Sequence, residues 1–305
     1  MKHIKIANSD LNASEISLGC MRISDLTNQE ISNLIHTALD EGINFFDHAD
    51  VYGGGKSEEK FSKALGMNPG LRDQMLIQTK CGIRKGSFDF SKEHILQAVD
   101  GSLKRLRTDY LDVLLLHRPD ALVEPEEVAE AFTILQNSGK VKYFGVSNQN
   151  PMQIELLSKF LKQKILINQL QFSITNTGMI DAGINVNMEI NPSINRDGSI
   201  LDYCRLKDIT IQPWSPFQFG FFEGVFLDNE KFPELNQKIN EIAATKGVSN
   251  TAIAIAWILR HPARMQPIVG TTNPGRLKDI CKASEVTLTR SEWYEVYQAA
   301  GNKLP

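Results

Sequence analysis

The sequence has few cysteines, no long apolar run and no excess of charge of either sign. Its four cysteines occur singly, without the close pairs of a zinc site or the density of a disulfide scaffold, at Cys20, Cys81, Cys204 and Cys281. We therefore expect reduced thiols. The first residues form no apolar signal core and no run of about 18 apolar residues occurs, so neither export nor a membrane span is indicated. The default location is the cytoplasm.

Charge and composition narrow the class of partner. The formal net charge is −3, so the chain has no excess of positive charge to attract phosphate backbones or anionic membranes. We therefore expect neither nucleic acid nor a membrane as partner. With 42% hydrophobic and 23% charged residues, the composition is that of an ordinary globular protein. No linker rich in Pro, Gly or Ser divides the chain, and we predict a single domain over residues 1–305.

Short apolar runs recur along the chain, and most are followed by a stretch with helical spacing of apolar residues. This alternation predicts parallel strands joined by helices. Eight such units fit the (β/α)8 TIM barrel, an α/β fold, better than a doubly wound sheet, which more often has five or six strands. The predicted strands are Ile16–Cys20, Ile43–Asp47, Met75–Thr79, Leu111–Leu116, Tyr143–Val146, Ile165–Gln169, Thr210–Pro213 and Pro267–Val269.

Helical periodicity predicts the outer layer of the barrel. Before the first strand, Ile4–Ile6 can belong to an N-terminal β-hairpin that closes the bottom, and two further helices extend the C-terminal part beyond the repeat. The predicted helices are Asn28–Glu41, Lys92–Leu106, Pro125–Ser138, Pro151–Leu161 and Pro233–Lys246, with Ala252–Leu259 and Arg290–Ala300 as the extra pair.

Four polar residues follow or end neighbouring strands, where the active site of a barrel lies. A lysine ammonium lowers the pKa of a tyrosine from its usual value of about 10, so Lys80 can tune Tyr52 as a proton donor. Asp47 can keep a desolvated Lys80 charged. His117 can orient and polarise a carbonyl while a cofactor delivers a hydride. Each side chain alone also fits a purely structural role, and their joint placement is what indicates catalysis.

Six motifs occur along the chain: FDHADVYGGG, IQTKCGI, LDVLLLHRPD, SGKVKYFGVSN, INQLQFS and IQPWSP. In type and order they resemble the aldo-keto reductase superfamily, and within it the bacterial oxidoreductase branch. The resemblance implies NADPH-dependent reduction of aldehyde or ketone carbonyls to alcohols. It implies Tyr52 as general acid, tuned by Lys80 and Asp47, with His117 orienting the carbonyl.

The resemblance also implies which residues bind the cofactor. A triad of polar side chains would hold the nicotinamide carboxamide, an indole ring would stack on the nicotinamide, and two loops would cover the ribose and pyrophosphate. In many relatives a lysine stands at the place of Gly270 and pairs with the 2′-phosphate of NADP, and this chain lacks that cation. Arg276 matches the family's second basic residue and can bind the phosphate instead, so NADH is the less favoured alternative. The expected cofactor residues are Gly19, Cys20, Met21, Ser147, Asn148, Gln169, Trp214, Ser215, Phe217, Gly270, Thr271, Thr272 and Arg276.

Other interpretations stay open. His48, Asp50 and His117 could in principle ligate a metal, although the HxH pair of barrel hydrolases is missing and we predict no metal. A second alternative is an NADPH-binding sensor with slow turnover. Asn273 is either a helix cap or part of an anion site. We expect Asn176–Asp197 to be a mobile substrate loop, and the chain to act as a monomer or weak oligomer.

Overall fold

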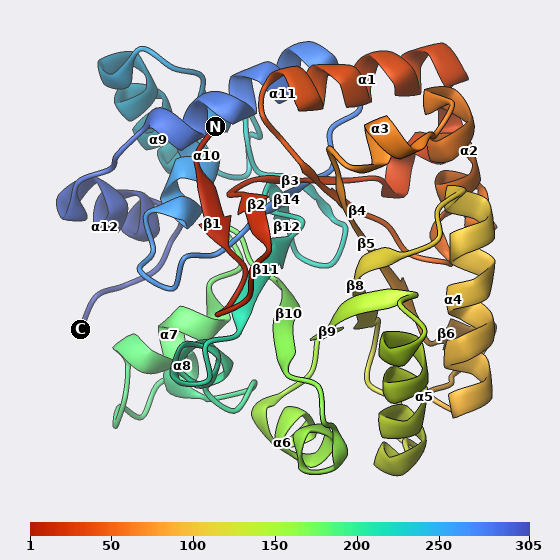
Figure 1. The fold of residues 1–305 in the computed structure, drawn as a ribbon. Coiled ribbons are helices and arrows are strands. Elements are labelled where there is room, and N and C mark those ends of the chain that lie inside the picture. The colour runs from red at the N-terminus through yellow and green to blue at the C-terminus, as the bar shows by residue number, and fades with distance from the viewer.

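The computed structural model describes residues 1–305, and its centre is a ring of eight parallel strands (Figure 1). Every hydrogen-bonded pair of neighbours in this ring is parallel. The Gln266 N–H donates to the Ile211 carbonyl at 3.0 Å and bridges the seam between the first and last strands of the order. The order is β11 (Thr210–Trp214), β10 (Ile165–Gln171), β9 (Val141–Ser147), β8 (Leu111–Leu116), β5 (Leu76–Cys81), β4 (Phe45–Asp47), β3 (Ser17–Gly19) and β14 (Ile268–Val269). The predicted barrel is confirmed.

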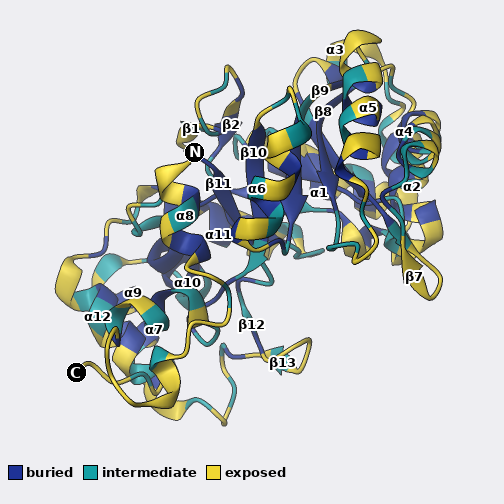
Figure 2. Ribbon diagram, turned by 90° about the horizontal axis from the view of Figure 1, so that it is seen from below, coloured by how far each residue is buried: buried dark blue, intermediate teal, exposed yellow.

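Most of the helices around the strands bury one face and expose the other (Figure 2). Capping boxes start three of them, and Thr27 and Glu30 form the one at the first long helix. All seven predicted helices are present, with ends shifted by up to two residues. They are α1 (Asn28–Asp40), α4 (Lys92–Leu106), α5 (Pro125–Asn137), α6 (Pro151–Phe160), α9 (Pro233–Lys246), α10 (Asn250–Leu259) and α12 (Arg290–Ala299).

Five helices were not bounded from the sequence: α2 (Lys56–Leu65), α3 (Pro69–Arg72), α7 (Gly178–Ile184), α8 (Ile200–Leu206) and α11 (Pro274–Cys281). The prediction that Asn176–Asp197 forms a loop throughout was wrong, because α7 and a short 3-10 turn lie within it. Two glycines hide the helical pattern of α7. Tertiary contacts stabilise it instead, since Ile180 is buried and the Tyr297 hydroxyl donates to Asp181 at 2.7 Å.

The N-terminal hairpin closes the bottom of the barrel, as predicted. Strand β1 (His3–Lys5) pairs antiparallel with β2 (Asn12–Ser14). Ile6 and Leu11 are buried in one cluster with barrel residues such as Val113. The Ala7 N–H donates to the Thr210 hydroxyl at 2.8 Å, at the first residue of β11. The hairpin therefore lies at the end of the barrel opposite the carboxyl ends of the strands.

Aromatic packing attaches the extra C-terminal helices to the barrel. The Trp257 and Trp293 rings stack with centroids 4.6 Å apart, and each indole N–H donates to the other residue's carbonyl at 3.0 Å. Phe172, at the end of the β10 region, stacks on Trp257 from the barrel side. No single helix is long and apolar enough to cross a membrane, although α9 and α10, bent by 92° at their junction, pass the same test as a pair.

Candidate active site

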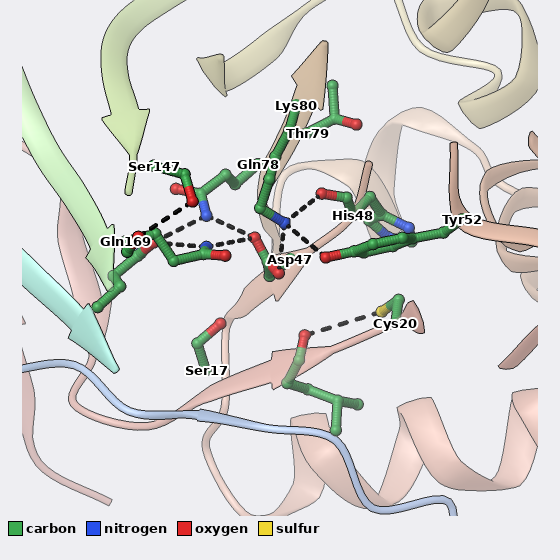
Figure 3. Close-up of polar contacts among 12 residues, drawn as sticks. Ser17, Cys20, Asp47, His48, Tyr52, Gln78, Thr79, Lys80, Ser147 and Gln169 are labelled. Atoms are coloured by element: carbon green, nitrogen blue, oxygen red, sulfur yellow. Dashed lines mark hydrogen bonds and ion pairs between the residues drawn. The ribbon is translucent and has the colours of Figure 1, made fainter. Parts of the chain in front are cut away.

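Three of the four predicted catalytic residues, Asp47, Tyr52 and Lys80, meet at the carboxyl end of β4 and β5 (Figure 3). The Lys80 ammonium donates to Asp47 Oδ2 at 2.8 Å, to the His48 carbonyl at 2.8 Å and to the Tyr52 hydroxyl at 3.1 Å. Lys80 lies within β5, fully buried, rather than after the strand as the sequence suggested. One cation thus joins a carboxylate to a phenol.

The buried Asp47–Lys80 pair is stabilised by hydrogen bonds that replace the lost hydration. Asp47 Oδ1 accepts from the amides of Gln78 at 2.6 Å and Gln169 at 3.0 Å. Burial lowers the pKa of Lys80, but Asp47 and Tyr52 outweigh it, so this pKa lies above its ordinary value. Lys80 is therefore an ammonium ion at neutral pH, despite its burial.

The pKa of Tyr52 departs from the sequence expectation. Burial raises it more than the nearby Lys80 lowers it, and Asp47 also raises it, so the net shift is upward. The expected net lowering was wrong for this structure, because a sequence does not show how far the ring is desolvated. The phenol consequently holds its proton throughout the neutral range, which suits a proton donor.

His117 faces Tyr52 across the mouth of the barrel. The two rings meet edge to face with centroids 5.9 Å apart. Burial first, and then the charges of Lys80 and Arg118, hold the pKa of His117 well below its usual value. Its Nδ1 is buried without a hydrogen-bond partner. The neutral imidazole can donate a hydrogen bond to a carbonyl oxygen beside the Tyr52 hydroxyl.

A chain of buried glutamines supports Asp47 from inside the barrel. Gln78 and Gln169 also donate to Gln212 Oε1, at 2.8 and 3.2 Å. Gln212 donates to Gln266 at 2.8 Å, and Gln266 donates to the Ser14 carbonyl at 2.7 Å. The Asp47 carboxylate and the Ser14 carbonyl can only accept, which fixes the orientation of the four amides. The NH2 groups of Gln78 and Gln169 face Asp47, whereas those of Gln212 and Gln266 point away from it, toward Ser14.

A cavity of about 290 Å³ opens at this end of the barrel. Tyr52, Asp47 and His117 line it, and Lys80 lies behind them. Eleven of the thirteen expected cofactor residues also line it: Gly19, Met21, Ser147, Asn148, Gln169, Trp214, Ser215, Phe217, Gly270, Thr271 and Arg276. Cys20 and Thr272 do not. The Cys20 side chain belongs to the hydrophobic core and its thiol lies 3.8 Å from the Leu18 carbonyl, which explains its absence.

Hydrogen bonds fix the position of the Trp214 indole at the carboxyl end of β11. Its N–H donates to Asn148 Oδ1 at 3.1 Å, and Asn148 donates to the Ser147 hydroxyl at 2.7 Å. The Ser147 hydroxyl donates in turn to the Gln169 carbonyl at 3.0 Å. Phe222, from the loop between β12 (Gln218–Phe219) and β13 (Gly224–Val225), stacks on the indole with centroids 6.0 Å apart. The polar triad and the aromatic surface therefore form one rigid unit.

Residues 15–300 match the family model described as the aldo/keto reductase family. The chain belongs to the aldo-keto reductase family. The oxidoreductase YcsN of Bacillus subtilis is 36% identical over 100% of both chains. A reductase from Agrobacterium fabrum, named 6-dehydroglucose reductase, is 35% identical over 98% of both chains. The chain shares 25% identity and a TM-score of 0.79 with the solved thermostable aldo-keto reductase Tm1743, covering 98% of this chain and all of that one.

Sequence reasoning missed several residues of this aldo-keto reductase's cavity. Arg22, Arg118 and Asp228 line it, and Gln78 and Gln212 support it from below. The glutamines could have been noticed, since each is a large polar residue inside a buried strand. Arg22 and Asp228 lie in connecting segments, whose folding onto the cavity no local pattern predicts, whereas Arg118 directly follows His117 at the end of β8.

His48 and Asp50, considered as metal ligands, do not gather with His117 into a group that could hold a metal ion. His48 is fully buried against Phe61, with both ring nitrogens unpartnered, and burial lowers its pKa to about 3. Asp50 is mostly buried beside Glu58. Burial, and then the charge of Glu58, raise the pKa of Asp50 to about 7.

Asp50→Asn is expected to reduce the pH dependence of stability. In the unfolded chain this carboxyl titrates near 3.9, so between about pH 4 and about pH 7 the folded protein binds the extra proton. The wild-type free energy of unfolding therefore loses this contribution as the pH rises through that window. Urea unfolding at about pH 5 and about pH 8 measures the loss, which should be smaller in the variant. Asp100→Asn, at an exposed carboxylate, is the control; equal pH slopes in wild type and Asp50→Asn would contradict the assignment.

Proposed function

We propose that this aldo-keto reductase reduces aldehyde or ketone carbonyls to alcohols with NADPH, using Tyr52 as the proton donor. The observation that carries the proposal is the Lys80 ammonium, which lies 2.8 Å from Asp47 and 3.1 Å from the Tyr52 hydroxyl at the wall of the cavity. The names of the similar proteins, an oxidoreductase and a reductase, support the reaction class.

The residues along the cavity fit a dinucleotide. Aldo-keto reductases use nicotinamide cofactors, and NADPH, when bound, would supply the hydride. Ser147, Asn148 and Gln169 offer polar atoms for the carboxamide, and Trp214 offers an aromatic surface for the ring. At the other end, a Cβ added to Gly270 would meet nothing within 4 Å, so the backbone there leaves open space for a ligand.

The proton has a defined origin. Tyr52 holds its proton at neutral pH and can pass it to a carbonyl oxygen that also accepts from the neutral His117. The phenolate left behind lies beside the Lys80 ammonium, whose charge Asp47 and its glutamine partners maintain. Negative charge that develops on the oxygen thus meets donors already in place, without reorganisation of the site.

The preference for NADPH over NADH depends on Arg276. The first turn of α11 is capped by Asn273, whose Oδ1 accepts from the Arg276 N–H at 3.0 Å, so the capping interpretation of Asn273 is confirmed. The Arg276 side chain is exposed and lines the cavity beside Gly270 and Thr271. With Gly270 in place of a lysine, Arg276 is the cation that we assign to the extra phosphate of NADPH.

The test is NADPH consumption with a panel of aromatic aldehydes and α-dicarbonyls. Wild type should turn over the panel with NADPH, and Arg276→Ala should raise KM for NADPH about tenfold or more while changing KM for NADH little. Lys278→Ala is the matched control, since Lys278 lies on the same helix and does not line the cavity. Binding of NADPH without reduction of any carbonyl would overturn the proposal in favour of a sensor. Equal changes in KM for NADPH and for NADH in Arg276→Ala would contradict the assignment of Arg276 to the extra phosphate of NADPH.

A further inference from the structure

Arg118 stands at the active site without a carboxylate partner. It follows His117 directly after β8 and lines the same cavity as Tyr52 and His117. Its guanidinium carbon lies 5.6 Å from the centre of the Trp214 ring. Burial lowers the pKa of Arg118, and Tyr52 is the one group that opposes the shift; no Asp or Glu contributes.

Three other arginines are removed from solvent, of which two pair with carboxylates and Arg260 donates to the Leu288 carbonyl at 2.7 Å. Arg72 pairs with Asp112 at 2.6 Å, and Arg105 pairs with Glu58 at 2.7 Å. A guanidinium carries five N–H donors and does not lose its proton in proteins, so partial desolvation without an anion costs free energy. Arg118 departs from this pattern, and it does so at the wall of the cavity.

The Arg118 guanidinium lies over an aromatic ring that is itself held in place. The Trp214 ring over which it lies is held by the hydrogen bond from the indole N–H to Asn148 at 3.1 Å. A cation on an aromatic face keeps its N–H groups free for a planar oxyanion. Because Arg118 is adjacent to His117 in the chain, an anion bound to it lies close to the carbonyl that His117 orients.

We propose that Arg118 binds an anionic group of the substrate, and that the enzyme prefers carbonyl compounds carrying a carboxylate or a similar small oxyanion over their neutral analogues. The inference rests on the proposed function and specifies its substrate class. Arg276 lies on α11, after β14, and is assigned to the cofactor. Arg22, the third arginine of the cavity, is exposed on the 3-10 turn after β3. The half-buried guanidinium of Arg118, between the ends of β8 and β11, is therefore the cation assigned to the substrate.

The experiment compares terephthalaldehydic acid with its methyl ester, and succinic semialdehyde with butanal, in NADPH-dependent reduction. In wild type the ratio of kcat/KM, anionic over neutral, is expected to be about tenfold or more. Arg118→Gln should bring both ratios close to one. Arg118→Lys keeps the positive charge but loses the planar set of N–H donors, and should give intermediate ratios. Arg205→Gln, at an exposed arginine on α8, should keep the wild-type ratios.

A binding measurement keeps this inference separable from the proposed function. Calorimetric titration with benzoate and with benzamide, with and without NADP+, needs no turnover. Benzoate should bind wild type about tenfold more tightly than benzamide, and the difference should vanish in Arg118→Gln. Reduction of both aldehydes of each pair with equal efficiency, or equal binding of benzoate and benzamide, would overturn the anion site and leave the function intact. Arg118-dependent benzoate binding without any reduction would support the anion site and overturn the function.

Discussion

Tyr52→Phe is expected to lower kcat for carbonyl reduction by about 10²–10⁴-fold, the range that a positioned general acid supplies. The substitution removes only the hydroxyl that accepts from Lys80 at 3.1 Å, so the ring keeps its edge-to-face contact with His117. The Kd for NADPH, measured by fluorescence titration, should change little. Single-turnover rates of NADPH consumption then report the loss in the chemical step.

Tyr203→Phe is the matched control for this substitution. The Tyr203 hydroxyl donates to Glu155 at 2.9 Å on the outer surface, between α8 and α6, and should contribute nothing to reduction. Equal kcat values for wild type and Tyr52→Phe would rule out Tyr52 as the proton donor. Loss of NADPH binding in Tyr52→Phe would instead show that the substitution disturbs the structure of the cofactor site.

Lys80→Met is expected to abolish most activity and to destabilise the fold. Removing one partner of a buried ion pair leaves the Asp47 carboxylate uncompensated, which costs about 3–5 kcal/mol in the free energy of unfolding. The Tyr52 phenolate would also lose the ammonium beside it, so kcat should fall to a similar extent as in Tyr52→Phe. Urea unfolding and steady-state kinetics measure the two effects separately.

The double variant Asp47→Asn with Lys80→Met tests whether the uncompensated Asp47 carboxylate causes the loss of stability. It should recover part of the lost stability, because no uncompensated charge remains, but none of the activity. Lys142→Met is the surface control, since half-exposed Lys142 pairs with Asp112 at 3.1 Å and should cost much less. A stable and fully active Lys80→Met protein would contradict the assigned role of the pair.

Much of the fold and part of the site could be predicted from local pattern. Apolar runs at regular intervals indicated the eight strands, and helical spacing with Thr, Asn and Pro starts indicated the long helices. The ends of parallel strands meet at one face, so Asp47, Tyr52 and His117 could be expected together before any distance was known. The single-domain organisation over residues 1–305, the cytoplasmic location and the monomeric or weakly oligomeric state stay predictions.

The tertiary structure decided what depends on burial and on contacts between distant segments. The direction of the Tyr52 pKa shift reversed, because desolvation of the ring outweighs the charge of Lys80, and desolvation is a property of the folded surroundings. The glutamine chain from Asp47 to Ser14 joins residues more than two hundred positions apart. Arg118 has no motif of its own beyond its place after His117, and only the packing of Trp214 shows it as an unpaired cation at the cavity. Periodicity along the chain thus determined the barrel and the order of its polar residues, whereas three-dimensional proximity determined their protonation and their partners.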